Sequence, residues 1–271
     1  MELDSIILKR FKSLFLLVLR LRNLSVLSLG GHLGKFLTFS PVQLSRDLPF
    51  GLIIVMTFDN PNLIYLGYSG YLQLQYPLVN LDSLVKAKLE IAMNGGDPGS
   101  CDPSNLIKGL RNVKILSLIF PKTVEIFGKF HEAVPVFENL IRLSIKTVVD
   151  FCSSLLSLPS LPFLLTKCPN LQTLVIEGPL CCHDTSELVC HCFTENSCIL
   201  SSPAKVLELT EYKGSTRELG QIKRFLEELS CLELVKVCAS AEDDKEKLRI
   251  TTDLLMLPRA SSQCKIQVQF S

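Results

Sequence analysis

The stretch Asn139-Leu140-Ile141-Arg142-Leu143-Ser144-Ile145 carries the pattern on which the fold prediction depends. It contains an L-x-x-L-x-L unit that begins at Leu140, and its last two apolar positions share one face of a short strand. The first apolar position lies in the turn before the strand. The Asn ahead of it is able to hydrogen-bond backbone groups of that turn. Because one such unit cannot bury its own apolar edge, copies of it are expected to stack.

Similar units recur along the chain, with Ile, Val, Ala or Tyr replacing some leucines. They begin at Leu24, Leu63, Leu84, Val113, Leu140, Leu171, Ala204 and Leu232, and the chain closes on alternating Ile266, Val268 and Phe270. From Leu63 onward, successive units start 21 to 33 residues apart, and leucine-rich repeats have about 20–29 residues. The longer gap after Leu24 is expected to hide a degenerate repeat. We therefore predict an α/β fold, a right-handed leucine-rich-repeat solenoid with short parallel strands on the concave face and irregular helices on the convex face.

Helices are expected between the strands. The strongest prediction is Thr216 to Leu229, where an apolar face recurs at helical spacing and Ser215 and Glu218 form an S-x-x-E capping box. Further helical segments are expected at residues 105–110, 153–167 and 245–256. Prolines within 153–167 are expected to break that segment into two turns.

Composition and charge limit the classes of partner. The 28 basic and 27 acidic residues are interspersed and give a formal net charge of +1, which argues against nucleic acid and against a membrane surface. The longest uncharged stretch, residues 60–81, is interrupted by prolines and polar residues, so no membrane span is expected. No signal-peptide cleavage site follows the apolar run near the N-terminus. The sequence therefore predicts an intracellular protein, cytoplasmic or nuclear, whose 11 cysteines are free thiols.

One cysteine- and histidine-rich segment is a candidate metal site. It contains Cys181-Cys182-His183, Cys190-His191-Cys192 and Cys198. Structural zinc sites usually present two ligand pairs at C-x-x-C spacing, whereas these pairs are adjacent or one residue apart. A surface loop with free thiols is preferred, and a zinc-binding protein built on the Cys181–Cys198 loop remains an alternative. We predict no catalytic residue, no metal and no cofactor.

The positive functional expectation is a protein-binding face. Residues that alternate with the buried strand positions point outward from the predicted sheet, and they are mixed in polarity, as in protein interfaces. The predicted partner-binding residues are Tyr65, Ser117, Arg142, Ser144, Thr173 and Lys236.

The C-terminal third resembles the FBD domain found at the end of plant F-box/leucine-rich-repeat proteins. The resemblance rests on residues 202–214 (SPAKVLELTEYKG), 229–237 (LSCLELVKV) and 257–262 (LPRASS), and residues 169–178 (PNLQTLVIEG) are similar to the last repeat before that domain. It covers residues 61–271. The expected organisation is an N-terminal segment with a degenerate repeat at 1–60, leucine-rich repeats at 61–198, and an FBD domain that continues the solenoid at 199–271.

This resemblance implies a substrate receptor of an SCF-type ubiquitin ligase, in which the repeats bind an unknown target protein. An F-box, which would dock a Skp-family adaptor and through it a cullin, is expected to be missing. Only residues 47–54 (DLPFGLII) weakly resemble the start of an F-box. The turn Asp59-Asn60-Pro61 follows soon after them, and the chain has no Trp. Adaptor and cullin are therefore expected only if an F-box is present upstream. The alternative is an F-box-less remnant or competitor that binds targets without recruiting a ligase.

Overall fold

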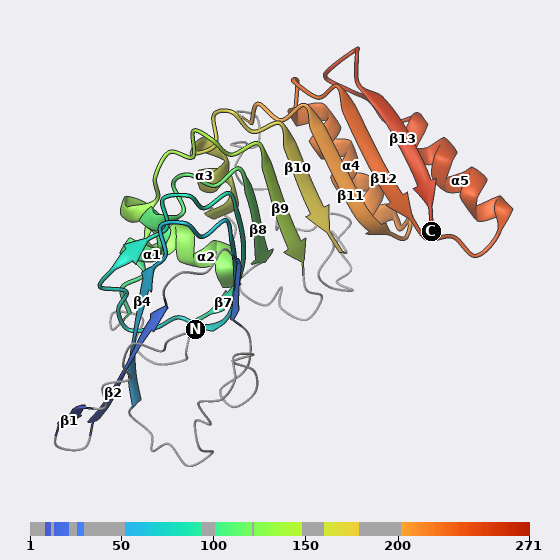
Figure 1. The fold of residues 1–271 in the computed structure, drawn as a ribbon. Coiled ribbons are helices and arrows are strands. Elements are labelled where there is room, and N and C mark those ends of the chain that lie inside the picture. The colour runs from blue at the N-terminus through green and yellow to red at the C-terminus, as the bar shows by residue number, and fades with distance from the viewer. Residues whose placement is uncertain are drawn as a thin grey trace. The chain divides into compact units, whose positions relative to one another are not determined.

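The computed structural model describes residues 9–11, 14–21, 26–29, 52–93, 101–120, 122–147, 160–178 and 202–271 (Figure 1). The chain divides into two compact units, which we treat one at a time. Unit 1 consists of Met1–Lys114 and Phe130–Pro135, and unit 2 of Ile115–Lys129 and Val136–Ser271.

Unit 1 contains two groups of strands. In the first, the order is β1 (Lys9–Phe11), β2 (Leu14–Leu21), β4 (Leu52–Asp59) and β6 (Val79–Asn80), and only the β1–β2 pair is antiparallel. In the second, β3 (Val26–Leu29), β5 (Tyr65–Tyr71) and β7 (Lys86–Ala92) are parallel neighbours. The unit also contains helix α1 (Ser104–Gly109) and the 3₁₀ turn η2 (His131–Ala133). Because β3 pairs directly with β5, strand β4 from the long gap adds to the other group of strands instead.

The core of unit 1 includes an aromatic cluster. The Phe58 ring stacks on Tyr76 at a centroid distance of 6.4 Å and meets Tyr68 edge-on at 6.3 Å. The two tyrosine hydroxyls lie 3.3 Å apart, and the Tyr76 hydroxyl accepts a hydrogen bond from the Gln73 backbone N–H at 3.2 Å. Burial raises the pKa of both tyrosines, so both are neutral hydrogen-bonding groups within the core.

Unit 2 is a parallel sheet covered by helices on one side (Figure 1). Its strands follow one another in sequence order: β8 (Ile115–Phe120), β9 (Arg142–Thr147), β10 (Thr173–Glu177), β11 (Val206–Tyr212), β12 (Leu234–Ala239) and β13 (Lys265–Phe270). The helices are α2 (Lys122–Lys129), α3 (Ser160–Thr166), α4 (Thr216–Glu228) and α5 (Asp244–Leu255).

The repeat pattern explains why the strands form where they do. In each L-x-x-L-x-L unit from Val113 to Leu232, the last two apolar side chains lie on the helix-covered side and are at most 2% exposed: Leu116, Leu118, Leu143, Ile145, Leu174, Ile176, Leu207, Leu209, Val235 and Val237. The side chains between them belong to the opposite side of the sheet. The strands predicted from these five units are therefore confirmed.

Two of the Asn residues ahead of the repeats hydrogen-bond the turn of the preceding repeat. Asn112 Nδ2 donates to the backbone oxygen of Asp82 at 3.0 Å, and Asn170 Nδ2 donates to that of Glu138 at 2.9 Å. Each acceptor lies in the turn of the preceding repeat, so the side chain ties consecutive repeats together. The prediction of a hydrogen bond within the residue's own turn is wrong for these two side chains, because each acceptor lies in the turn of the preceding repeat.

The helix predictions hold with one omission. Helices α1, α4 and α5 lie within one or two residues of the predicted bounds, and α3 forms the second half of the predicted 153–167 segment. The first half, residues 153–159, is outside the described residues. Helix α2 was not predicted, although it is longer than the predicted α1.

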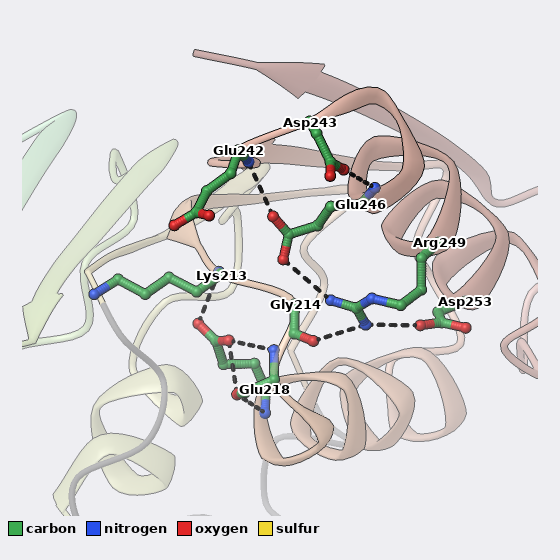
Figure 2. Close-up of polar contacts among 9 residues, drawn as sticks. Lys213, Gly214, Glu218, Glu242, Asp243, Glu246, Arg249 and Asp253 are labelled. Atoms are coloured by element: carbon green, nitrogen blue, oxygen red, sulfur yellow. Dashed lines mark hydrogen bonds and ion pairs between the residues drawn. The ribbon is translucent and has the colours of Figure 1, made fainter.

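The capping box of α4 is confirmed, and it belongs to a larger polar network (Figure 2). Glu218 is 4% exposed, and its carboxylate accepts hydrogen bonds from the backbone N–H groups of Lys213 (3.2 Å) and Ser215 (2.9 Å). On the other side, Arg249 Nη1 of α5 donates to the Gly214 backbone oxygen at 3.1 Å and to Asp253 at 3.2 Å. The loop between β11 and α4 is thus held by both helices.

Candidate target-binding face

The side of the unit 2 sheet that the helices leave uncovered is the candidate site, and we call it the open face. The strand register aligns two rows across it. One row runs from β8 to β13 through Ser117, Ser144, Val175, Glu208, Lys236 and Gln267. The neighbouring row runs through Ile115, Arg142, Thr173, Val206, Leu234 and Lys265. Five of the six predicted binding residues therefore lie in these two rows of unit 2.

The sixth predicted residue, Tyr65, lies on β5 of unit 1. Its neighbours in register are Val26 on β3 and Lys86 on β7. The Lys86 ammonium lies 5.7 Å from the centroid of the Tyr65 ring, within the range of a cation–π contact. Tyr65 therefore belongs to unit 1 and is not part of the open face.

Glu208 is the centre of the charged part of the open face. Its Oε2 accepts a hydrogen bond from Arg142 Nη2 at 2.6 Å, and its Oε1 lies 3.3 Å from Lys236 Nζ. Arg142 reaches it from β9, across β10, and Lys236 reaches it from the adjacent β12. The Arg142 hydrogen bond, helped by Lys236, holds the pKa of the Glu208 carboxyl below its ordinary value despite partial burial. The three side chains keep between 21% and 43% of their surface exposed, so a partner is able to contact them.

A second polar contact lies beside this cluster. The Ser144 hydroxyl donates to the Glu177 carboxylate, from β9 to β10. Ser144 is only 6% exposed, and Val175 in the same row is 3% exposed. Contact of Ser144 with a target protein therefore stays a prediction. In the structure its hydroxyl orients the Glu177 carboxylate.

Sequence reasoning singled out Arg142, Ser144 and Lys236 without the two carboxylates that hold them. Glu208 is one position along from the buried Leu207, and Glu177 is one along from the buried Ile176, so the alternation placed both on the outer side. What the alternation lacked was the register between strands. Only that register shows that Arg142 and Glu208, 66 residues apart, meet across β10.

The Cys181–Cys198 segment lies outside the described residues, so the zinc alternative stays a prediction. Among the described residues, no group of three or more His, Cys, Asp or Glu side chains is placed to hold a metal ion. Cys168 is buried, which raises the pKa of its thiol to about 12, and its Sγ lies 3.1 Å from the Leu164 backbone oxygen. That environment disfavours the nucleophilic thiolate.

Within the described part of the chain, no helix has the length and apolar character needed to cross a membrane.

The described residues define an α/β protein built from parallel-strand repeats. Among curated proteins, the chain is similar to F-box/LRR-repeat proteins of Arabidopsis thaliana. A putative F-box/LRR-repeat protein of that plant is 47% identical over 225 residues, covering 80% of this chain and 50% of the relative. Another F-box/LRR-repeat protein is 46% identical over 226 residues, covering 78% of this chain and 36% of the relative.

A third relative, also an F-box/LRR-repeat protein, is 46% identical over 225 residues, covering 79% of this chain and 47% of its own length. The chain thus spans about half the length of the curated relatives it matches, or less. No protein-family model and no solved structure matches the chain. Its homologues are thus plant F-box/LRR-repeat proteins, and the FBD assignment of residues 199–271 stays a prediction.

Proposed function

We propose that the chain is a non-catalytic, target-binding member of the plant F-box/LRR-repeat family, whose repeats form a right-handed solenoid with the open face on its concave side. The observation that carries the proposal is the charged cluster on the open face. Arg142, Glu208 and Lys236 come from three different strands, are partly exposed, and lie on the side that the helices leave free. The similarity to F-box/LRR-repeat proteins supports a role in protein interaction rather than in chemistry.

The charge of the open face indicates the kind of target. Four exposed or half-exposed cations from three strands outnumber the carboxylates Glu177 and Glu208: Arg142, Lys146, Lys236 and Lys265. The surplus is positive, and Ile115, Val206 and Leu234 add half-buried apolar surface beside it. We therefore expect a target segment that carries acidic and apolar side chains. Electrostatic complementarity of this kind raises the association rate and fails at high salt.

The test is affinity capture with the full chain from plant extract, followed by mass spectrometry. The variant Arg142→Ala/Lys236→Ala removes two cations from the open face. The control Lys205→Ala/Lys223→Ala removes two exposed cations elsewhere, from the turn before β11 and from α4. Truncating charged groups that become buried in an interface costs about 2–5 kcal/mol, so the first variant is expected to bind its target at least about tenfold more weakly. A target held equally by both variants would refute the open face as the binding site.

Recruitment of a ligase is a separate part of the proposal. Family membership implies an intracellular receptor whose F-box docks a Skp-family adaptor and a cullin, and we propose this role only for a protein that carries an F-box upstream of these repeats. Purified chain mixed with a Skp-family adaptor tests the point by size-exclusion chromatography. Co-elution would mean that these residues bind the adaptor themselves. Separate elution, with target binding intact, would leave target recognition as their function.

A further inference from the structure

The charged cluster of the open face places a carboxylate between two cations. Glu208 Oε2 lies 2.6 Å from Arg142 Nη2, and Glu208 Oε1 lies 3.3 Å from Lys236 Nζ. The Glu208 side chain keeps 21% of its surface exposed, against 39% for Arg142 and 43% for Lys236. A molecule that approaches the open face therefore contacts the two cations more readily than the carboxylate between them.

Glu208 also decides where the Arg142 side chain lies. Two strand spacings, about 10 Å, separate β9 from β11, so the guanidinium reaches Glu208 only when the side chain lies along the sheet over β10. Val175, the β10 neighbour of Glu208 in the register, belongs to the open face and is only 3% exposed, which agrees with such a cover. Without the carboxylate, the like charges and the large rotamer freedom of Arg142 and Lys236 favour positions apart.

Both cations keep hydrogen-bond donors for a ligand beyond those that Glu208 uses. A guanidinium has five N–H donors and an ammonium has three, and Arg142 contacts Glu208 through Nη2 alone. Val206 and Leu234, which are partners in the register of β11 and β12, lie two residues before Glu208 and Lys236 on the same face. Both are half-buried, so apolar surface begins about 7 Å along the strands from the charged cluster.

We propose that Arg142 and Lys236, which we call the cation pair, bind one carboxylate of the target, and that Glu208 is the positioning residue that holds the cation pair in place for it. Val206 and Leu234 contact an apolar side chain of the target beside that carboxylate. The two cations and Glu208 have a net charge of +1, which a single carboxylate neutralises. This inference rests on the proposed function, because it assigns a contact to the open face.

Glu208 has two opposing effects on such a ligand, and they act on different rate constants. Its negative charge repels the ligand carboxylate, which mainly slows association. Its hydrogen bonds keep the cation pair ordered, which mainly slows dissociation. At an ionic strength of about 0.15 M the Debye length is about 8 Å, so screening limits the first effect. Ordering one freed side chain on binding costs about 2- to 12-fold in affinity, and the second effect therefore dominates.

Peptides selected from a random display library on the full native chain provide the probe, with Arg142→Ala/Lys236→Ala as the counter-selection. Each selected peptide is then remade with its Asp and Glu residues replaced, one at a time, by Asn or Gln. One such replacement is expected to weaken binding to the native chain at least about tenfold and to leave binding to Arg142→Ala/Lys236→Ala unchanged, because the contact is already lost there. Equal losses in both chains would overturn the carboxylate as the ligand of the cation pair.

Glu208→Gln tests the positioning role, with the rate constants of the same peptides measured by biolayer interferometry at about 0.15 M ionic strength. The dissociation constant is expected to rise about 2- to 12-fold through faster dissociation, while association is no slower. The control is Glu233→Gln, which removes the same charge and breaks the exposed ion pair with Lys205 (2.8 Å) outside the open face. Its rate constants are expected to match those of the native chain, and circular dichroism checks the fold of both variants.

The possible failures of this inference and of the proposed function are distinguishable. Peptides that need the cation pair but bind Glu208→Gln as tightly as the native chain, or more tightly, would overturn the role of Glu208 and leave the open face as the binding site. If no selected peptide distinguishes the native chain from Arg142→Ala/Lys236→Ala, the proposed function fails at this face, and the inference fails with it.

Discussion

Gly214 is the residue at which a single added methyl group tests how unit 2 is held together. It lies between β11 and α4 with a φ of +71°, in the left-handed region that side chains rarely adopt. A Cβ built on it would lie 2.6 Å from Ile250 Cγ1, 2.9 Å from Ile250 Cδ1 and 3.0 Å from Arg249 Nη2. Ile250 is 0% exposed, so it has no free space into which to move. Gly214→Ala therefore meets a backbone penalty and a steric one.

The two penalties have known sizes. A non-glycine residue in the left-handed region costs about 1–2 kcal/mol. Overpacking a well-packed core costs about 1–3 kcal/mol. The expected loss of unfolding free energy for Gly214→Ala is thus about 2–5 kcal/mol, because the two sources are independent. Gly220 is the matched control, since a Cβ there meets nothing within 4 Å. Gly220→Ala in the middle of α4 is expected to stabilise the protein by up to about 1 kcal/mol.

The assay is hydrogen–deuterium exchange of peptides from α4 and α5, together with urea denaturation followed by circular dichroism. The steric part is isolated by a double-mutant cycle with Ile250→Ala, which removes both clashing carbons. In that background Gly214→Ala is expected to cost only the backbone penalty, about 1–2 kcal/mol. An unchanged cost would refute the clash between Gly214 and Ile250. A Gly214→Ala variant as stable as the native chain would refute the reasoning altogether.

Three further predictions concern individual polar groups. Glu208→Gln should flatten the acid side of the stability–pH profile. The pKa of the Glu208 carboxyl is lowered in the folded state. Its contribution to the free energy of unfolding is therefore present above the ordinary value of 4.5 and is lost as the pH falls through the lower folded value. The difference should be about 0.2–1 kcal/mol because the pair is partly exposed, and urea titrations between pH 3 and 7 measure it. Ser215→Ala should destabilise α4 by about 1 kcal/mol in urea denaturation, since it removes the N-cap acceptor, and a loss below the error of the method would contradict that role. Tyr76→Phe should destabilise unit 1 by about 1–3 kcal/mol, because the Gln73 N–H loses its acceptor within the core; unchanged exchange protection of β5 peptides would count against this.

Much of the secondary structure follows from short-range sequence signals. The L-x-x-L-x-L unit specifies a turn and a strand within six residues, and Ser215 and Glu218 specify the start of α4 within four. Such signals are local, so they survive without knowledge of the rest of the chain. Helix α2 was not predicted, although it is longer than the predicted α1. Strand β4 was not predicted because its partners β2 and β6 belong to no repeat.

The sequence by itself determined where the strands of unit 2 lie and which of their side chains face the helices, because the alternation of a strand is fixed by backbone geometry. Only the tertiary structure decided what the outer side chains do. The register of neighbouring strands brings Arg142 and Lys236 to Glu208, turns Ser144 toward Glu177, and leaves the groups of β13 without a neighbouring strand among the described residues. Those outcomes depend on distances between residues far apart in the chain, and alternation along one strand carries no information about them.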